Sequence, residues 1–405
     1  MTSPPPLEGL RVLEIGHFVA APFCTRLLAD LGADVIKIEP LEGDPVRQWG
    51  EAVDGASLWW SMHGRNKRSI AIDLKSPRGR ELALDLVPAC DAVVENFRPG
   101  QLGKLGLGVE QMRARRPDLV IGHISGFGQD GPYRDRAAFG MIGEALGGLR
   151  YLTNHPPGIT DLPPVRVGVS IGDSIAGLYA AFGIMAALWR RDSARGGGAR
   201  TVDVALTDAV LSLMEGMLPE YGMLGKIKAP TGGGIATAAP TNAYPTRDGR
   251  WVLIGANSDR LFEKLTRLMD APELAASPLY RDNPSRVRHA ADLDRRIADW
   301  TGQFDAEALI AALNAADIPN GTAYTSAECA VDPQYRHRRM VREVDDPLFD
   351  RPVLQAGIVP RFVEAPGEVR WAGPSLGQHS AEILREIAGL QDDEIERLKA
   401  EKVIA

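Results

Sequence analysis

Asp173 is the residue of this chain with the clearest potential for chemistry. It stands between Gly172 and Ser174, just before an apolar run with helical spacing, which predicts a helix from about Ile175 to Arg191. Asp173 or Ser174 is the expected N-cap of that helix. A cap needs one short polar side chain, so Ser174 could serve and leave an ionised carboxylate beside the helix N-terminus. The local sequence leaves both roles open for Asp173, a structural cap and a catalytic carboxylate.

A second group of residues near the ends of predicted strands could bind an anion or a ring. Cations that converge at the strand ends of an open α/β sheet would suit a polyphosphate. Scattered charges are also typical of a solvated surface, and the sequence does not separate the two interpretations. Asn96 and Phe97 add an amide for hydrogen bonding and a ring for stacking. The basic members of the group are residues 63–68, Lys75, Arg98 and Lys104.

The elements that must position these residues alternate between strands and helices. Residues 11–15, 22–31 and 34–38 read as a strand, a helix and a second strand, which is a βαβ unit and requires parallel strands. The alternation continues to a strand at 119–124 and predicts a doubly wound, Rossmann-like α/β domain. Residues 126–131 match the pattern GxGxxG, but Pro132 and no amphipathic helix follows, so dinucleotide binding is not indicated.

The character of the sequence changes beyond residue 205. A helical run at 207–217 precedes a glycine-rich stretch at 231–234, a strand pair that flanks residues 247–250, and several helices. This order predicts a smaller α+β domain. We therefore expect a large domain over residues 1–205, a linker and small domain with the glycine-rich loop over 206–340, and a segment over 341–405 that returns to the large domain.

Composition and charge exclude several classes of function. The net charge of −7 argues against a nucleic-acid partner, and three widely spaced cysteines suggest neither disulfides nor a metal site. The apolar stretch at 175–189 looks too short to span a bilayer, which takes about 20 residues. No P-loop, metalloprotease helix or GxSxG elbow is present. We expect a cytoplasmic protein with no membrane partner.

The chain resembles the class III CoA-transferases, a family that also includes the α-methylacyl-CoA racemases. The resemblance covers nearly the whole chain, and it rests on the joint order of motifs that are weak one by one. They are LEGLRVLEIGHFVAAPFCTRLLADLGADVIKIE, GRNKRSIAIDLKSPRG, VENFRPG, GFGQDGPY, GDSIAGLYAAFGIMAAL and GPSLGQHSAEIL. The resemblance implies a Rossmann-like large domain built from both chain ends, a small domain between them, and an interlocked homodimer.

The resemblance places Asp173 on the family's nucleophilic aspartate. It implies that coenzyme A enters as an acyl-CoA substrate and that the carboxylate carries it as an aspartyl-CoA thioester, with no requirement for ATP or a metal. Implied CoA contacts are His17, Phe18, Val19, Ala20, Ile72, Asp73, Leu74, Lys75, Asn96, Phe97, Arg98, Lys104, Ala137, Ala138, Phe139 and Gly140.

The chain departs from its relatives at two of the expected contact positions. It has Val19 where formyl-CoA transferase has a glutamine, and Pro40 where relatives often have an arginine. Gly232, Gly233 and Gly234 resemble a mobile loop that covers the aspartyl intermediates, and a plain flexible connector is the other interpretation. The contacts to the adenosine phosphates and to an oxyanion therefore stay open.

Two alternatives to CoA transfer follow from the same resemblance. A racemase needs a His-Asp base pair, and Phe139 and Gly140 stand at the corresponding positions. A catalytically silent CoA-binding protein would not need Asp173. The sequence is most similar to the branch that uses succinyl-CoA and C4 or C5 dicarboxylates. Arg47, Arg65 and Arg150 are candidates to bind the distal carboxylate.

Overall fold

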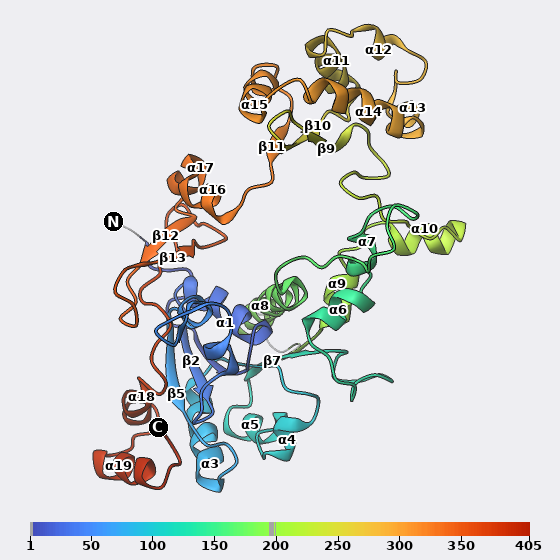
Figure 1. The fold of residues 1–405 in the computed structure, drawn as a ribbon. Helices are drawn as coiled ribbons and strands as arrows, with labels where there is room; N and C mark the ends of the chain where they lie inside the picture. Colours follow the sequence, from blue (N-terminus) through green and yellow to red (C-terminus); the bar gives the residue numbers. More distant parts are fainter. Residues whose placement is uncertain (1–2, 194–197, 199) are drawn as a thin grey trace. The chain divides into compact units, whose positions relative to one another are not determined.

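The computed structural model describes residues 3–193, 198 and 200–405, and it divides into two compact units (Figure 1). The larger unit comprises residues 1–149, 167–218 and 332–405, and the smaller comprises 150–166 and 219–331. Three stretches differ from the ranges expected from the sequence. Residues 206–218 and 332–340 belong to the larger unit, and 150–166 to the smaller. Leu206 and Ala209 are buried in the core of the larger unit, which accounts for the first difference.

A six-stranded parallel sheet forms the centre of the larger unit. The spatial order is β5-β2-β1-β6-β7-β8, and every neighbouring pair is parallel. Counted along the chain, this is the strand order of the Rossmann fold, so the predicted doubly wound α/β domain is confirmed. The bounds are Arg11–Ile15 (β1), Asp34–Glu39 (β2), Lys67–Ala71 (β5), Ala92–Glu95 (β6), Val120–Ser125 (β7) and Thr201–Ala205 (β8).

Helices cover both faces of this sheet. Val12 and Val35 point into one apolar core with α1 and α8, while Leu13 and Ile36 point into the core on the other face. That second core is covered by α3, α5, α18 and α19, and the backbone N–H of Asp73 donates to the carbonyl of Val403 at 2.8 Å. These helices are Ala20–Asp30 (α1), Pro77–Leu86 (α3), Val109–Arg115 (α5), Ile171–Asp192 (α8), Ser380–Glu386 (α18) and Asp392–Ala400 (α19).

Helix α8 is longer than predicted. It has 22 residues, and by length and composition alone it could cross a membrane, so the prediction of an apolar run too short to span a bilayer is wrong. Packing against α1, β7 and β8 explains part of its apolar composition, the buried face of the helix. At the crossing with α1, a Cβ on Gly177 would lie 2.7 Å from the carbonyl oxygen of Ala20, so only glycine permits this approach.

The smaller unit combines an antiparallel sheet with helices, as predicted. Strands β9 (Thr241–Pro245) and β10 (Trp251–Gly255) flank the expected turn, and β11 (Asn320–Thr322) pairs with β10. The sheet shares a core with α11 (Asp259–Leu268), α14 (Ala290–Thr301) and α15 (Ala306–Ala315). This part of the chain also contains helices α12 (Glu273–Ala276), α13 (Asn283–Arg288) and α16 (Ser326–Val331) and most of the short α7 (Leu149–Leu152).

The helix predicted at 207–217 is wrong. The chain forms α9 (Leu206–Leu211) and α10 (Met217–Leu224), and Glu215 between them has a left-handed φ of 46°, which a continuous helix does not allow. Short elements complete the larger unit: η1 (Pro45–Gln48), β3 (Ala52–Val53), β4 (Ala56–Ser57), α2 (Leu58–His63), η2 (Val87–Ala89), α4 (Gln101–Lys104), α6 (Gly140–Leu146), α17 (Pro333–His337), β12 (Val341–Val344) and β13 (Val353–Ala356).

Candidate active site

Asp173 is the third residue of α8 and does not cap it. The N-cap is Ser170, which makes no side-chain capping bond, and the hydroxyl of Ser174 donates to the carbonyl of Ser170 at 3.0 Å. The predicted N-cap at Asp173 or Ser174 is therefore wrong. The reason is close packing: a Cβ on Gly172 would lie 2.9 Å from the carbonyl oxygen of Gly140, so the start of α8 fits against the start of α6.

The carboxylate of Asp173 lies against Gly140. A Cβ built on Gly140 would meet Oδ2 of Asp173 at 2.0 Å, so a side chain at position 140 and this carboxylate exclude each other. Gly140 is the first residue of α6, and Asp173 lies in the first turn of α8. The partial positive charge of helix N-termini favours an ionised carboxylate there. Asp173 is half-buried, and Glu144 nearby is buried and accepts a hydrogen bond from the Gly172 N–H at 3.4 Å.

The loop after β1 lies at the switch point of the sheet, where β1 and β6 are neighbours and the strand order reverses. Ligands of such sheets bind at this crevice. The side chain of Asn96, directly after β6, holds the loop from both sides: its Oδ1 accepts from the His17 N–H at 2.8 Å, and its Nδ2 donates to the His17 carbonyl at 2.8 Å. Phe18 adopts a left-handed φ of 63°. The loop therefore has a fixed and unusual backbone conformation.

Aromatic rings connect this loop to the residues around Asp173. The ring of Phe18 lies 5.8 Å from that of Phe139 and 4.9 Å from that of Trp49, measured between centroids. Phe139 directly precedes Gly140, so the switch-point loop reaches the segment that contacts the carboxylate of Asp173. Three of the predicted site segments, residues 17–20, 137–140 and Asp173, thus meet in one region of the larger unit.

Buried charges support the loop from below. The ammonium of Lys37 lies 2.5 Å from Glu14 Oε1 and 2.7 Å from Asp44 Oδ2, and it donates to the Gly16 carbonyl at 2.8 Å. Asp44 Oδ1 accepts from the Phe18 N–H at 3.0 Å. Burial alone would lower the pKa of Lys37, but the carboxylates of Asp44 and Glu14 outweigh it and raise that pKa. The cluster is therefore charged at neutral pH and fixes Gly16 and Phe18.

A pocket of about 360 Å³ opens at the carboxyl ends of β1, β2 and β5. His17 and Phe97 meet edge to face there at 5.1 Å, and burial lowers the pKa of His17, which keeps its ring neutral. Pro40, one of the departures from relatives, belongs to the same wall. The pocket brings together six of the predicted CoA contacts: His17, Ile72, Asp73, Leu74, Lys75 and Phe97.

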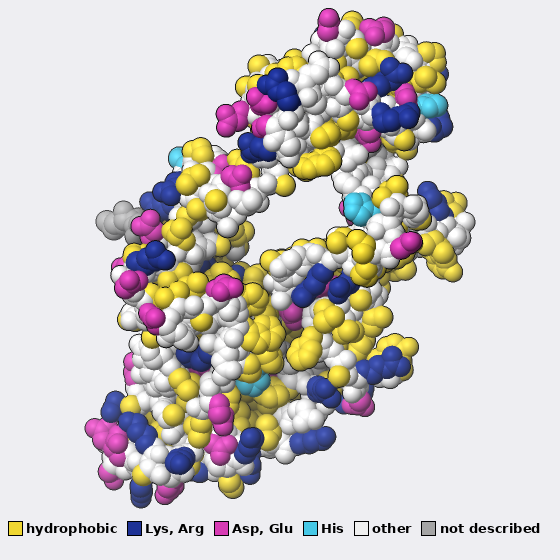
Figure 2. Space-filling view, in the orientation of Figure 1, with side chains coloured by type: hydrophobic (Ala, Val, Ile, Leu, Met, Phe, Trp, Pro, Cys, Tyr) yellow, Lys and Arg dark blue, Asp and Glu magenta, His cyan; other side chains and the backbone are white. Residues whose placement is uncertain are grey.

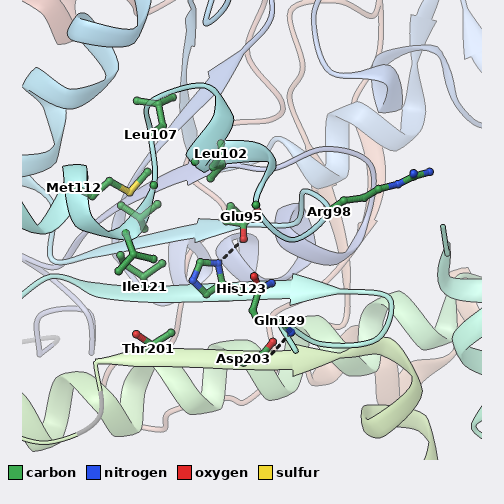
Figure 3. A pocket seen from close by; sticks show the side chains of 15 residues that line it. Glu95, Arg98, Leu102, Leu107, Met112, Ile121, His123, Gln129, Thr201 and Asp203 are labelled. Carbon is green, nitrogen blue, oxygen red and sulfur yellow. Dashed lines mark hydrogen bonds and ion pairs between the residues drawn. The ribbon is translucent and has the colours of Figure 1, made fainter. Parts of the chain in front are cut away.

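Arg98 lines a different pocket, of about 430 Å³, on β6, β7 and β8 (Figure 3). In Figure 3 its side chain extends away from the other labelled residues, while His123 and Glu95 are hydrogen-bonded to each other. Glu95 also accepts from the Phe97 N–H at 2.7 Å, so this pair holds the turn that carries Asn96.

The remaining predicted contacts lie outside the 360 Å³ pocket. Lys104 ends α4 and is exposed, as is Ala137. Ala138 packs on Gly126, where an added Cβ would lie 2.5 Å from its own. Val19 and Ala20 are buried at the start of α1.

The predicted glycine loop belongs to the smaller unit. The N–H of Gly232 donates to the Asn154 carbonyl at 3.1 Å, and the hydroxyl of Thr231 donates to the Gly234 carbonyl at 2.6 Å. A Cβ on Gly233 would lie 2.8 Å from Oδ1 of Asn242, which follows the first residue of β9. The loop is thus a turn with defined contacts, beside a pocket of about 340 Å³ in the same unit.

Two of the three arginine candidates already bind carboxylates of the protein itself. Arg47 donates to both oxygens of Glu39 at 2.7 and 2.8 Å. Arg65 is fully buried and donates to both oxygens of Asp30 at 3.0 and 2.6 Å. Arg150 belongs to the smaller unit and, among the residues that the structure describes, forms no such pair.

Sequence reasoning missed Asp44 and Glu144. Asp44 had a usable signal, because an acidic residue before Pro45 is a typical helix start, and Asp44 Oδ1 does accept from the Val46 N–H at 2.9 Å. Glu144 had none, because its burial against the start of α8 depends on two helices that are distant in sequence.

Fold and site together define an α/β enzyme with a helix-start carboxylate next to the switch point of a Rossmann-type sheet. The model of CoA-transferase family III matches residues 7–380. The chain belongs to this family and is a CoA-transferase, which displaces the silent binding protein as an interpretation.

Known relatives span the whole chain. It is 46% identical over 403 residues to a succinyl-CoA–D-citramalate CoA-transferase of Chloroflexus aurantiacus, a match that covers 99% of this chain and 98% of the relative. It is 36% identical to the beta subunit of a succinyl-CoA–L-malate CoA-transferase from the same organism, with 98% of each covered. The crystal structure of a CaiB/BaiF family protein from Brucella suis matches with a TM-score of 0.82 and 35% identity, over 95% of this chain and 100% of that one.

Proposed function

We propose that this enzyme transfers CoA from succinyl-CoA to a C4 or C5 dicarboxylate through a thioester on Asp173. The position of the Asp173 carboxylate carries this proposal. It fills the space in front of Gly140 at the start of α8, next to the loop at the switch point of the sheet. A nucleophile must be ionised and within reach of the substrate, and a half-buried carboxylate at a helix start meets both requirements.

In the first half-reaction, an oxygen of Asp173 attacks the carbonyl carbon of the succinyl thioester. The C–S bond breaks, CoA leaves as a thiolate, and a mixed anhydride joins the succinyl group to Asp173. The thiolate then attacks the side-chain carbonyl carbon of Asp173 and displaces succinate. The products are free succinate and an aspartyl-CoA thioester, and no net proton or electron is taken up.

In the second half-reaction, a carboxylate of the acceptor attacks the aspartyl thioester and forms a new mixed anhydride, with CoA again released as a thiolate. Attack of this thiolate on the acceptor carbonyl gives the acceptor-CoA thioester and regenerates the Asp173 carboxylate. Each step exchanges one activated acyl bond for another, which accounts for transfer without an external energy source.

The residues around Asp173 have roles that follow from their contacts. The pocket lined by His17, Leu74 and Phe97 offers an apolar, stacking surface for the adenosine part of CoA, with Lys75 at its exposed rim. The bracing of Gly16 and Phe18 keeps this side of the site in one conformation. The glycine loop at 232–234 has no oxyanion role in this proposal, because the N–H groups of Gly232 and Gly234 already donate to the carbonyls of Asn154 and Thr231.

The choice of substrates rests on the relatives. The names of the relatives at 46% and 36% identity specify succinyl-CoA with D-citramalate and L-malate, and a Haloarcula hispanica relative at 35% identity uses mesaconate. A racemase is not favoured, because Gly140 has no side chain to act as a base and could not gain one without displacing Asp173.

The direct test is Asp173→Asn, which removes the nucleophile at almost constant volume. Transfer from succinyl-CoA to D-citramalate, L-malate and mesaconate should fall by about 1,000-fold or more. Mass spectrometry of the wild type incubated with succinyl-CoA should find CoA attached to the peptide that contains Asp173. CoA attached to any other peptide, or an active Asp173→Asn variant, would contradict the mechanism.

A second substitution tests the geometry without touching the nucleophile. Gly140→Ala places a methyl group where Oδ2 of Asp173 now lies, at 2.0 Å, and should lower kcat by at least about 100-fold. Gly103→Ala is the matched control, since an added Cβ there meets no atom within 4 Å. Equal activity of the two variants would show that the position of the carboxylate is not critical.

We further propose that the active form is an interlocked homodimer. Support comes from α8, where Leu178, Phe182 and Trp189 are 57%, 72% and 66% exposed, and hydrophobic side chains are visible over this part of the larger unit (Figure 2). An apolar surface of this kind on one face is typical of a subunit interface. Analytical ultracentrifugation should find a dimer at micromolar concentration, and a monomer would contradict the proposal.

A further inference from the structure

A pocket of about 290 Å³ in the C-terminal part of the larger unit is lined by four arginines. They are Arg338 after α17, Arg339, Arg342 on β12, and Arg361 in the segment that follows β13. Glu364 is the acidic residue of the lining. Basic side chains are visible over β12 and β13 in Figure 2. The pocket therefore concentrates positive charge in a chain whose net charge is −7.

These arginines have no carboxylate partner. Across residues 3–193, 198 and 200–405, none of the four forms an ion pair with another residue, whereas Arg47, Arg65 and Arg68 of the same unit each do. Nε of Arg342 is buried without a hydrogen-bond partner. Burial and the charges of Arg339 and Arg65 lower the pKa of Arg342, and the carboxylates of Glu368 and Asp30 act on it but do not outweigh them. Among the described residues, the positive charge of the pocket is thus only partly offset, by Glu364 in its lining and by the charges of Glu368 and Asp30.

The backbone that carries these arginines is tightly fixed. Arg339 has a left-handed φ of 57°, and its carbonyl oxygen would lie 2.2 Å from a Cβ on Gly357. The N–H of Gly357 donates to the Met340 carbonyl at 2.8 Å, so the turn at 338–340 is locked onto the β12–β13 hairpin. Only a glycine at 357 allows this approach.

A second glycine fixes the opposite wall of the pocket. A Cβ on Gly367 would lie 2.3 Å from the carbonyl oxygen of Asp30 and 2.9 Å from Cγ2 of Ile358. The segment with Arg361 and Glu364 is thereby held against the end of α1 and the residues that follow β13. Burial, together with the charges of Arg339 and Arg65, lowers the pKa of Arg342. The arginines are thus held close together by the backbone, against their mutual repulsion.

We propose that this pocket binds a compact oxyanion with at least two negative charges, a phosphate group or a small polycarboxylate. Guanidinium groups form paired hydrogen bonds to such anions, and a fixed set of them loses little entropy on binding. The volume of about 290 Å³ suits a small anion and is at the lower limit of pockets for larger ligands. The site is separate from the proposed CoA pocket, which lies at the carboxyl ends of β1, β2 and β5.

Isothermal titration calorimetry of the full-length protein at constant ionic strength tests this proposal, with inorganic phosphate and citrate as probes. The wild type should bind at least one of them at one site per chain, and acetate should not compete. Tight binding of phosphate alone would identify a phosphate group as the ligand, and tight binding of citrate alone would identify a polycarboxylate. The double variant Arg342→Ala/Arg361→Ala should lose at least tenfold in affinity.

The matched control is Arg260→Ala/Arg267→Ala on α11, which removes the same charge from the smaller unit and should leave the affinity unchanged. Thermal unfolding without anion separates loss of the site from loss of the fold, because the pocket variant should melt no lower than the wild type. Equal affinity in the pocket variant and the control would overturn the proposal. So would a pocket variant that turns dimers into monomers while neither probe binds the wild type, because carboxylates of a second copy would then neutralise the arginines.

Discussion

The larger unit holds two clusters of charge that are built in opposite ways. Beneath the switch-point loop, Glu14, Lys37, Lys67 and Asp44 are all buried, and each is within hydrogen-bond distance of an opposite charge. In the C-terminal part, the four arginines around the 290 Å³ pocket have no such partner among the described residues. One unit thus contains a compensated cluster, whose charges form ion pairs with one another, and an uncompensated cluster, whose arginines form none among the described residues.

The two clusters differ in how their charges are stabilised, and this difference indicates their roles. Buried ions lose their hydration and survive only when other groups of the protein replace it. In the compensated cluster these replacements include the Gly16 carbonyl and the Phe18 N–H, so the charges hold the active-site loop. The arginines of the second cluster are in contact with solvent, so water hydrates their charges when no anion is bound. Compensation within the protein gives the first cluster a structural role, whereas the exposed arginines of the second cluster are available to the anion that we propose.

Removal of Lys37 should break the compensated cluster and have the largest effect. Lys37→Met leaves the buried Asp44 without its cation and Glu14 with Lys67 alone, which should lower the free energy of unfolding by about 3–5 kcal/mol. It also releases the Gly16 carbonyl, so KM for succinyl-CoA should rise in whatever protein remains folded. Urea unfolding followed by circular dichroism measures the first effect.

Lys264→Met is the control for this substitution. Lys264 pairs with Asp317 at 2.7 Å, but the Asp317 side chain is 91% exposed, so its loss should cost several-fold less. If the two variants were equally stable, burial would not be what makes the first cluster structural.

The two lysines of the compensated cluster should respond to pH in opposite ways. Burial, together with the charge of Lys37, lowers the pKa of Lys67 to about 8, although Glu14 acts against this. Between pH 8 and about 10.5 the unfolded chain holds a proton at this residue that the folded protein has lost, so stability due to Lys67 increases with pH. The gain is on the order of 3 kcal/mol at most.

Comparison of the wild type with Lys67→Met at pH 7.5 and pH 10 isolates this effect. The advantage of the wild type over the variant in free energy of unfolding should be larger at pH 10. An advantage that shrinks with rising pH would mean that Glu14 dominates and that Lys67, like Lys37, has a raised pKa.

The sequence predicts the fold well where the pattern is local. Alternating strands and helices indicated the parallel sheet, because a βαβ unit leaves little freedom in topology. The predicted start of α8 was wrong, because the helix begins at Ile171 rather than near Ile175. That start depends on the contact between Gly172 and Gly140, which are distant in the sequence. The single helix predicted at 207–217 was also wrong, because the chain turns at Glu215 between two short helices.

The residues of the candidate site also fall into two groups, those with a local signal in the sequence and those that depend on tertiary contacts. Asp173, His17 and Asn96 stand at the ends of elements that the sequence shows, and the structure brings the loop, the turn at 137–140 and α8 together. The burial of Glu144 and the pairing of Arg65 with Asp30 depend on tertiary contacts, so no local sequence pattern predicts them. The arginine pocket was not predicted either. Arg338 and Arg361 are separated in the sequence, and only the hairpin of β12 and β13 brings them to one pocket.

The smallest expected effect comes from the uncompensated cluster, and its sign matters more than its size. Arg361→Ala removes one of several like charges, so without added anion the free energy of unfolding should stay the same or rise by up to about 0.5 kcal/mol. Arg385→Ala breaks a surface pair with Asp392 at 2.5 Å and should lower it by up to about 1 kcal/mol. Urea unfolding in a buffer free of phosphate and citrate measures both. A loss of stability in Arg361→Ala as large as that in Arg385→Ala would show that Arg361 has a partner in the protein, and the contrast between the two clusters would disappear.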